Sequence, residues 1–233
     1  MNWKGVLPAI TTNLAADLTV DHAALAVHCR WMIDSGCTGL VVCGSLGEAA
    51  TLSFDEKIAI VRTSVAAVAG RAPVVLGIAS LSTLEAVALA KAAEQAGAQG
   101  LMVLPPYVYS SDWREMKAHV SAVGMDDAIV EGIYAGAVGW IAGLVNAFPV
   151  ESVALFNLAM RGEKVRAAAL YAWFLPLLRL DTVPKFVQLI KWVQAEVGRG
   201  TPFVRAPRLV LAGPDLAAAR AVLTAALQHP PVL

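Results

Sequence analysis

The first half of the chain repeats one pattern, in which a short apolar, β-rich run is followed by a turn and then by an amphipathic helix. Alternation of strand and helix is typical of a parallel sheet covered by helices. Two helices are expected to begin at capping boxes, Ser53 with Glu56 and Ser82 with Glu85, where each serine accepts from a backbone amide and each glutamate reaches back. The pattern predicts strands at 5–12, 39–43, 74–78 and 100–104.

This alternation stops at Val123. Only Gly124 and Met125 separate the helix expected before this point from the next helix-like segment, which starts at Asp126 and has no strand in front of it. A fifth strand is expected at 139–144, followed by helices at 150–160, 163–179, 183–197 and 215–227. We expect a single structural domain, with a truncated barrel at 1–149 and a helical C-terminal region packed on it at 150–233.

Four successive strand–helix units suggest a (β/α)8 barrel, a fold that usually takes about 250 residues before any appendage is added. The chain has 233 residues, and its pattern predicts about five parallel strands. We therefore predict an α/β protein with an incomplete (β/α)8 TIM-type barrel and a C-terminal helical appendage. The barrel is either open or completed by another chain.

The composition limits the partners that the protein can have. Eighteen basic residues balance 18 acidic ones, so the chain lacks the basic excess that nucleic-acid binding requires. Hydrophobic residues make up 58% of the chain and charged residues only 15%, whereas about 25% is usual for charged residues in globular proteins. This shortage of surface charge predicts a covering subunit, and hence a homo-oligomer.

The uncharged run from Gly132 to Val150 is the best candidate for a membrane span. Glycines, Asn146 and Pro149 interrupt it, which favours a helix end, a buried strand and a loop over a continuous spanning helix. The N-terminus has no signal-peptide pattern, and the three cysteines lack metal-binding spacing. We expect a cytoplasmic protein with buried thiols and no membrane association.

The turn Gly44-Ser45-Leu46-Gly47-Glu48 follows the second predicted strand, on the side of the sheet where barrel enzymes carry out their chemistry. Its two glycines allow a tight turn with accessible amide donors, and Ser45 adds a hydroxyl, so a small carboxylate could bind there. A plain connection between strand and helix can have the same composition. The turn alone therefore leaves both interpretations open.

Several segments together resemble the dihydrodipicolinate synthase and N-acetylneuraminate lyase family. They are Gly5 to Thr12, Gly44 to Ser53, Leu104-Pro105-Pro106-Tyr107, Gly124 to Asp127, Gly139 to Asn146 and Thr182 to Lys185. The resemblance implies a class I aldolase fold that binds pyruvate or another 2-oxo acid as a Schiff base on lysine. It also implies that no cofactor or metal is needed, and that the subunits form dimers or tetramers.

The resemblance assigns roles to individual residues. Ser45 matches the hydroxyl of the family's proton relay, and Gly44, Ser45 and Leu46 match the turn that holds the pyruvate carboxylate. Tyr107 matches the relay tyrosine that is lent across the dimer interface, and Ile141 matches a residue beside bound pyruvate.

Two family motifs are missing from the chain: the Tyr-Asn-x-Pro segment of the fifth strand and the Schiff-base lysine of the sixth. One internal deletion near Val123/Gly124 would account for both motifs and for the short length. No other lysine is expected at a strand end, where such a nucleophile would lie: Lys4, Lys57, Lys91, Lys117, Lys164, Lys185, Lys191. We expect lost or very weak lyase activity, and the alternative is a non-catalytic oligomerising protein derived from the family.

Other polar residues suggest weaker candidates. Asp126 and Asp127, with His119, could form a metal or acid–base site, but adjacent acids before a helix are more often caps. Glu48 is expected to bury its carboxylate against the backbone amides of its own turn.

Overall fold

The computed structural model describes residues 3–80, 82–104 and 126–231. Its strands are β1 (Gly5–Pro8), β2 (Leu40–Val42), β3 (Val74–Ile78), β4 (Gly100–Val103) and β5 (Gly139–Ala142). β1 pairs with β5, and β2 pairs with β3, which pairs with β4, all in parallel. A parallel bridge between Ala9 and Val41 joins the two groups, giving the order β5-β1-β2-β3-β4.

The two faces of this sheet are packed differently. On one face, Leu7, Val41 and Val75 form a small cluster with the partly buried Met102 and Ile141. The alternate residues of β1, β2, β3 and β5 point the other way, into a large core shared with the helices. In the described part of the chain, β4 and β5 each pair with one strand only. The small cluster is therefore the inner face of an incomplete barrel.

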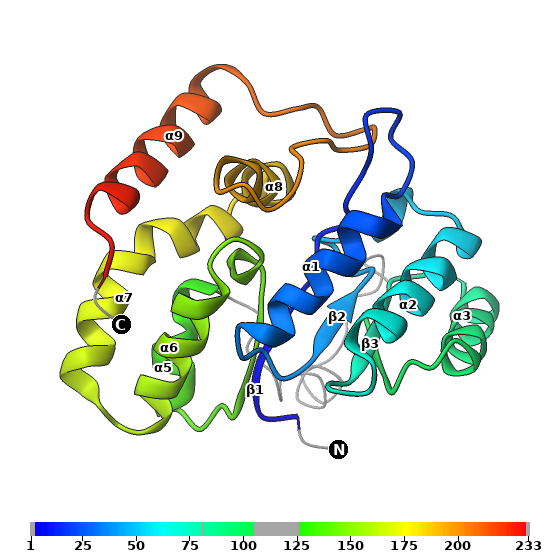
Figure 1. The fold of residues 1–233 in the computed structure, drawn as a ribbon, viewed down its shortest axis with the longest axis horizontal. Coiled ribbons are helices and arrows are strands. Elements are labelled where there is room, and N and C mark those ends of the chain that lie inside the picture. Colours follow the sequence, from blue (N-terminus) through cyan, green and yellow to red (C-terminus); the bar gives the residue numbers. More distant parts are fainter. Residues whose placement is uncertain (1–2, 81, 105–125, 232–233) are drawn as a thin grey trace.

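The helices cover the outer face of the sheet (Figure 1). The α-helices are α1 (His22–Asp34), α2 (Phe54–Val68), α3 (Thr83–Gln95), α5 (Ile129–Tyr134), α6 (Pro149–Met160), α7 (Lys164–Leu178), α8 (Phe186–Glu196) and α9 (Gly213–Gln228). Short 3-10 helices are η1 (Ala49–Thr51), η2 (Asp126–Ala128), η3 (Leu144–Asn146) and η4 (Arg179–Asp181). The helix predicted before Val123 lies outside the described residues.

One predicted capping box is confirmed and the other is only half formed. At α2, Ser53 accepts from the Glu56 amide, and the Glu56 carboxylate accepts from the Ser53 amide. At α3, Ser82 caps the helix by accepting from the Glu85 amide. The Glu85 carboxylate instead accepts from the hydroxyl of Ser80 at 2.6 Å, and the Ser82 amide donates to the Ser80 hydroxyl oxygen at 3.2 Å.

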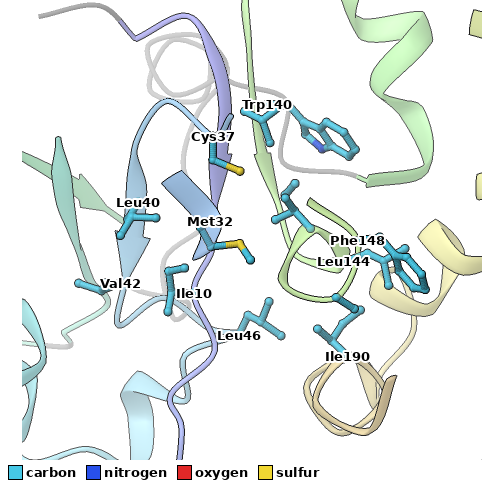
Figure 2. Close-up of a cluster of buried hydrophobic side chains, with 14 of the residues drawn as sticks. Ile10, Met32, Cys37, Leu40, Val42, Leu46, Trp140, Leu144, Phe148 and Ile190 are labelled. Atoms are coloured by element: carbon cyan, nitrogen blue, oxygen red, sulfur yellow. The ribbon is translucent and has the colours of Figure 1, made fainter. Parts of the chain in front are cut away.

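The C-terminal helices share the core of the barrel. Figure 2 shows Leu144 beside Phe148, with Trp140 of β5 at the top of the view. Leu46, from the turn after β2, faces Ile190 of α8. Trp140 and Trp192 are buried, and Trp173 stacks on Phe174 with ring centroids 5.3 Å apart. These aromatic side chains therefore serve the core of this chain.

The uncharged run 132–150 contains the end of α5, the strand β5, η3 and the first residues of α6, so a helix end and a buried strand divide it as predicted. Among the described residues, no helix combines the length and apolar character needed to cross a membrane. Cys29, Cys37 and Cys43 are free and buried, as predicted. Burial raises the pKa of the Cys29 thiol to about 11 and the pKa values of the other two to about 12.

Candidate functional site

The turn after β2 is tightly constrained. Cys43 and Glu48, at its two ends, adopt the left-handed backbone conformation with φ of 55° and 58°. A Cβ atom at Gly47 would lie 2.9 Å from the carbonyl oxygen of Ile10, so this position accommodates only glycine. Left-handed backbone at residues other than glycine costs about 1–3 kcal/mol and persists only where the surroundings impose it. The turn is thus held in a conformation that its own residues do not favour.

This conformation leaves several donors unused. The amide of Glu48 bonds back to the Ser45 carbonyl at 3.1 Å, and the amide of Ala49 bonds to the Gly44 carbonyl at 3.2 Å. The amides of Ser45, Leu46 and Gly47 have no acceptor among the residues that the structure describes. Ser45 is exposed, and its hydroxyl also has no partner in that part of the chain. Consecutive free amides beside a hydroxyl form a cradle suited to an anion.

The other predicted site residues lie near this turn or outside the described region. The side chain of Leu46 is buried in the main core, so only its backbone can serve a ligand. Gly44 faces Met102, whose Cε atom would lie 3.6 Å from an added Cβ. Ile141 packs in the same inner-face cluster as Met102, on β5. Tyr107 lies outside the described residues.

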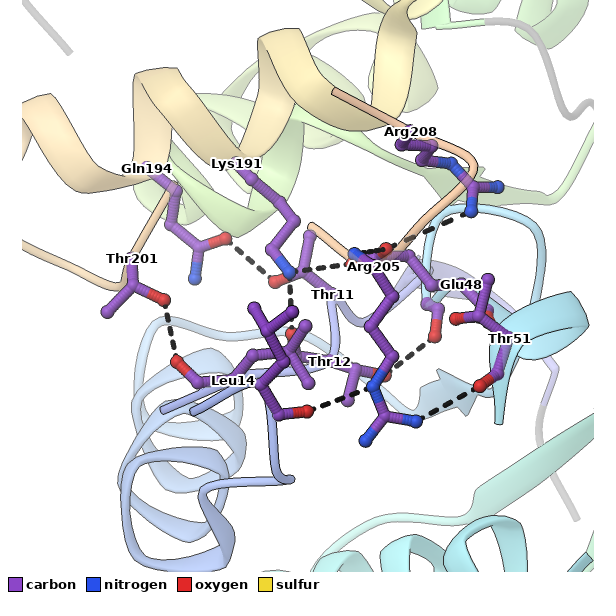
Figure 3. Close-up of polar contacts among 12 residues, drawn as sticks. Thr11, Thr12, Leu14, Glu48, Thr51, Lys191, Gln194, Thr201, Arg205 and Arg208 are labelled. Atoms are coloured by element: carbon purple, nitrogen blue, oxygen red, sulfur yellow. Dashed lines mark hydrogen bonds and ion pairs between the residues drawn. The ribbon is translucent and has the colours of Figure 1, made fainter. Parts of the chain in front are cut away.

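A buried ion pair fixes the end of the turn. The Nζ of Lys191 on α8 donates to the Glu48 carboxylate at 2.7 Å and to the Thr12 carbonyl at 2.9 Å (Figure 3). The two side chains are only 2% and 1% exposed. The other Glu48 oxygen accepts from the Arg205 amide at 3.0 Å, and Arg208 lies 3.8 Å from it.

The expectation that Glu48 binds the amides of its own turn is therefore wrong. A carboxylate removed from water needs a compensating charge, and Lys191 supplies it from another element of the fold. Burial lowers the pKa of Lys191, and the attraction of Glu48 opposes this shift. Lys191 is the only buried lysine among the described residues, yet its amine is engaged by Glu48 and Thr12.

Further polar contacts extend this clamp. Arg205 forms a bidentate ion pair with Glu56 at 2.6 and 2.9 Å and also donates to the carbonyl groups of Leu18 and Thr51. The Arg205 guanidinium lowers the pKa of Glu56 to about 2. The segments after β1 and β2 are thereby tied to α8 and to the loop that follows it.

Asp126 was expected to cap the helix that follows it, but its carboxylate binds backbone amides at the end of β5. Its carboxylate accepts from the amides of Gly143 and Leu144 and from the indole nitrogen of Trp140, at 2.8–3.2 Å. It therefore fixes the carboxyl end of β5. Within the described ranges, no group of three or more His, Cys, Asp or Glu residues is arranged to hold a metal ion.

The structure also pairs Asp126 with Asp181, which the sequence analysis did not identify. Burial raises the pKa of Asp126 to about 6, against the hydrogen bonds that it accepts. Burial and the charge of Asp126 raise the pKa of Asp181 to about 8. Two carboxyl groups this close cannot both ionise freely, so the pair holds a proton at neutral pH.

Sequence reasoning also missed the role of Lys191. A signal was present, because the lysine interrupts the apolar run Leu189-Ile190-Lys191-Trp192-Val193 on a helix that was expected to pack on the barrel. A long charged side chain in such a run requires a buried partner. The only way to identify Glu48 as that partner was through the three-dimensional structure.

Together, the parallel sheet and the donor-rich turn at its carboxyl end define an incomplete (β/α)8-type barrel, a fold whose enzymes carry their sites at that end. The family model described as "Dihydrodipicolinate synthetase family" matches residues 2–124. The chain belongs to this family.

Curated relatives match the same half of the chain. The 4-hydroxy-tetrahydrodipicolinate synthase of Rhizobium meliloti (strain 1021) is 40% identical over 121 residues, which are 52% of this chain and 41% of the relative. That of Mycolicibacterium paratuberculosis (strain ATCC BAA-968 / K-10) is 43% identical over 118 residues, 51% of this chain and 39% of the relative. The matched part thus spans less than half the length of these relatives.

Solved structures share the fold over nearly the whole chain. The 4-hydroxy-tetrahydrodipicolinate synthase of Methylacidiphilum fumariolicum SolV superposes with a TM-score of 0.90 at 22% identity, covering 97% of this chain and 96% of that one. YagE of Escherichia coli K12, solved in complex with pyruvate, gives a TM-score of 0.85 at 22% identity, with coverages of 97% and 99%. These structures confirm the TIM-barrel fold.

The buried ion pair makes a stability prediction. Glu48→Gln leaves the Lys191 charge buried without its counterion, and we expect the free energy of unfolding to fall by about 3–5 kcal/mol. Adding Lys191→Met to the same chain should recover most of this loss, because no unpaired charge then remains. Urea denaturation measures both effects.

The matched control for the ion pair is Lys185→Met. Lys185 pairs with Asp215 in an exposed ion pair, and both side chains are about half exposed. This substitution should change the free energy of unfolding by less than about 1 kcal/mol. A loss for Glu48→Gln no larger than that of the control would contradict the clamp.

Because of the Asp126–Asp181 pair, we expect the free energy of unfolding to depend on pH. The folded protein holds protons between about pH 4 and pH 8 that the unfolded chain has released, so these carboxyl groups make stability fall as the pH rises through this window. The side chain introduced by Asp181→Asn cannot ionise. We therefore expect the free energy of unfolding of this variant, relative to that of the natural protein, to rise between pH 5 and pH 8. Urea denaturation at the two pH values measures the gain, with Asp215→Asn as control. Parallel behaviour of Asp181→Asn and the natural protein would show that no proton is shared.

Proposed function

We propose that this protein binds a small 2-oxo acid such as pyruvate at the turn 44–48, without turning it over by the family's lysine chemistry. The observation that carries the proposal is a set of donors in this turn that have no acceptor in the described part of the chain: three consecutive amides beside the exposed hydroxyl of Ser45. The complex of YagE with pyruvate supports the choice of ligand. Gly44, Ser45 and Leu46 would hold the carboxylate, and Ile141 would contact the rest of the molecule from β5.

We infer the loss of the lyase reaction from the environments of the lysines in the described part of the chain. A Schiff-base lysine must present an unprotonated amine to the ligand. Among the described lysines, Lys4, Lys91, Lys164 and Lys185 are exposed, Lys57 is half buried, and Lys191 is engaged by Glu48. Without the imine, nothing accepts the electron pair of the breaking carbon–carbon bond. Ser45 and Tyr107, the relay residues by resemblance, would then have no intermediate on which to act.

An internal deletion would explain this state of the site. The family model ends at residue 124, the position at which the strand–helix alternation of the sequence also stops. The chain continues beyond that point with β5, which pairs directly with β1 as the last strand of a closed barrel does. We infer that the strands carrying the lysine and the relay tyrosine are absent between these two points, and that residues 150–233 form one structural domain with the barrel.

Incubation with pyruvate and sodium borohydride tests this proposal, because borohydride reduces a lysine imine to a stable adduct. We expect intact-mass spectrometry to detect no stoichiometric adduct on this protein. A family member that retains the Schiff-base lysine, treated in parallel, should gain one pyruvate-derived adduct. A stoichiometric adduct on the present chain would contradict the loss of the nucleophile, and peptide mapping would then identify the lysine responsible.

A second function, as a non-catalytic oligomerising protein, is favoured by the outer face of β4. Leu101 and Val103 are 45% and 52% exposed, although they lie in register with the buried Leu76 and Ile78 of β3. An apolar strand face invites association where, as at β4 among the described residues, the neighbouring edge has no partner strand. A second copy of the chain would cover this face in a homo-oligomer.

Sedimentation velocity tests this association. We expect the natural protein to sediment as a dimer or larger species, and Leu101→Asp with Val103→Asp to weaken the association at least about tenfold, because two apolar side chains lose their burial. Leu209→Asp is the control, since Leu209 is an exposed leucine in the loop before α9. A natural protein that sediments as a compact monomer would exclude this function.

A further inference from the structure

A cavity of about 440 Å³ lies in the C-terminal region, between η4, the start of α8 and α9. The helices α8 and α9 are neighbours there (Figure 1). Lys185 and Asp215 are the only polar residues that line the cavity, and the other lining residues are leucine, valine, proline and alanine. None of residues 44–48 lines it. Cavities of this size, mostly apolar and with few polar groups, are typical of small-molecule sites.

The walls of the cavity offer apolar surface to a ligand. Val183, in the loop before α8, is 41% exposed. Leu180 of η4 and Val222 of α9 are partly buried and pack against the main core. Leu189 and Ala219, which also line the cavity, belong to that core themselves. The interior of the cavity is therefore suited to the apolar part of a small molecule.

The two charged residues join opposite walls of the cavity. The Nζ of Lys185, at the start of α8, donates to Oδ2 of Asp215, in the first turn of α9, at 2.5 Å. This contact uses one of the three N–H donors of the ammonium group and one of the two carboxylate oxygens. The side chains are 56% and 51% exposed, so both charges remain accessible to a further ionic partner.

The ion pair selects the charges of the ligand. A ligand with a single carboxylate would be attracted by Lys185 and repelled by the adjacent Asp215, and the reverse holds for an amine. An α-amino acid carries an ammonium and a carboxylate on one carbon, so it can lie antiparallel to the ion pair. Four charges of alternating sign then meet, and the Lys185–Asp215 contact need not break.

We propose that this cavity binds a free α-amino acid whose apolar side chain is about the size of that of leucine. The carboxylate of the amino acid would pair with Lys185 and its ammonium group with Asp215. The side chain would lie against Leu180, Val183 and Val222. A 2-oxo acid lacks the ammonium group, so this ligand differs from the one proposed for the turn 44–48, and neither proposal depends on the other.

Four ligands test the site: L-leucine, L-alanine, 4-methylpentanoate and 3-methylbutylamine. The last two are leucine without its ammonium group and leucine without its carboxylate. In ligand-observed NMR titrations of the full chain, we expect leucine to have a dissociation constant about tenfold or more below that of alanine, because its longer side chain buries more apolar surface. We expect a gap of about threefold or more from each singly charged ligand, since half-exposed charges are partly screened. Failure of leucine to bind, or equal binding of leucine and either singly charged ligand, would overturn the proposal.

Variants locate the binding. Ala218 is exposed and lines the cavity, so Ala218→Leu should narrow the cavity and weaken leucine binding about tenfold or more. Ala217→Leu is the matched control: Ala217 is also exposed on α9 but does not line the cavity, and the affinity should stay unchanged. Asp215→Asn should weaken leucine about threefold and leave 4-methylpentanoate no weaker, since the repelling charge is gone. Equal effects of Ala218→Leu and Ala217→Leu would refute the assignment.

Discussion

The buried ion pair between Glu48 and Lys191 is the interaction on which the rest of the structure depends. It joins the turn after β2 to helix α8 across the main core, and both side chains are almost completely shielded from water. Such a pair contributes little net stability compared with an apolar contact, but losing one member is very costly. The ion pair therefore contributes mainly by determining where the turn after β2 lies relative to helix α8. Lys191 and the Arg205 amide hold the Glu48 carboxylate, and Glu48 keeps its left-handed backbone conformation at the end of the turn 44–48.

Buried polar contacts also hold the carboxyl end of β5. Asp126 holds the end of β5 through the amides of Gly143 and Leu144, and its charge helps to raise the pKa of Asp181 in the C-terminal region. Asn146 then ties β5 to the carbonyl of Ala9 after β1. Charged and polar groups from the C-terminal half thus fix the carboxyl ends of β1, β2 and β5. An incomplete barrel can keep the carboxyl ends of these strands ordered in this way.

Much of the fold could be predicted from local patterns, since strand β3 and the capping box of α2 depend on residues close together in sequence. The family could also be predicted, because short sequence motifs of the chain resemble those of the family. What could not be predicted were contacts between distant residues. Lys191 and Glu48 are 143 positions apart, and nothing in either local sequence specifies the other. The cavity between α8 and α9 escaped prediction for the same reason, because its ion pair joins Lys185 to Asp215, 30 residues away.

The central proposal is that the turn 44–48 binds an anion and is held in place by α8, in a chain that we propose lacks the family's nucleophile. Amide hydrogen exchange, followed by mass spectrometry with and without pyruvate, tests it most directly. The account predicts that pyruvate slows exchange in the peptide containing Ser45, Leu46 and Gly47, and that this protection is lost in Lys191→Met. Unchanged exchange of that peptide on adding pyruvate, or equal protection in Lys191→Met, would contradict the account.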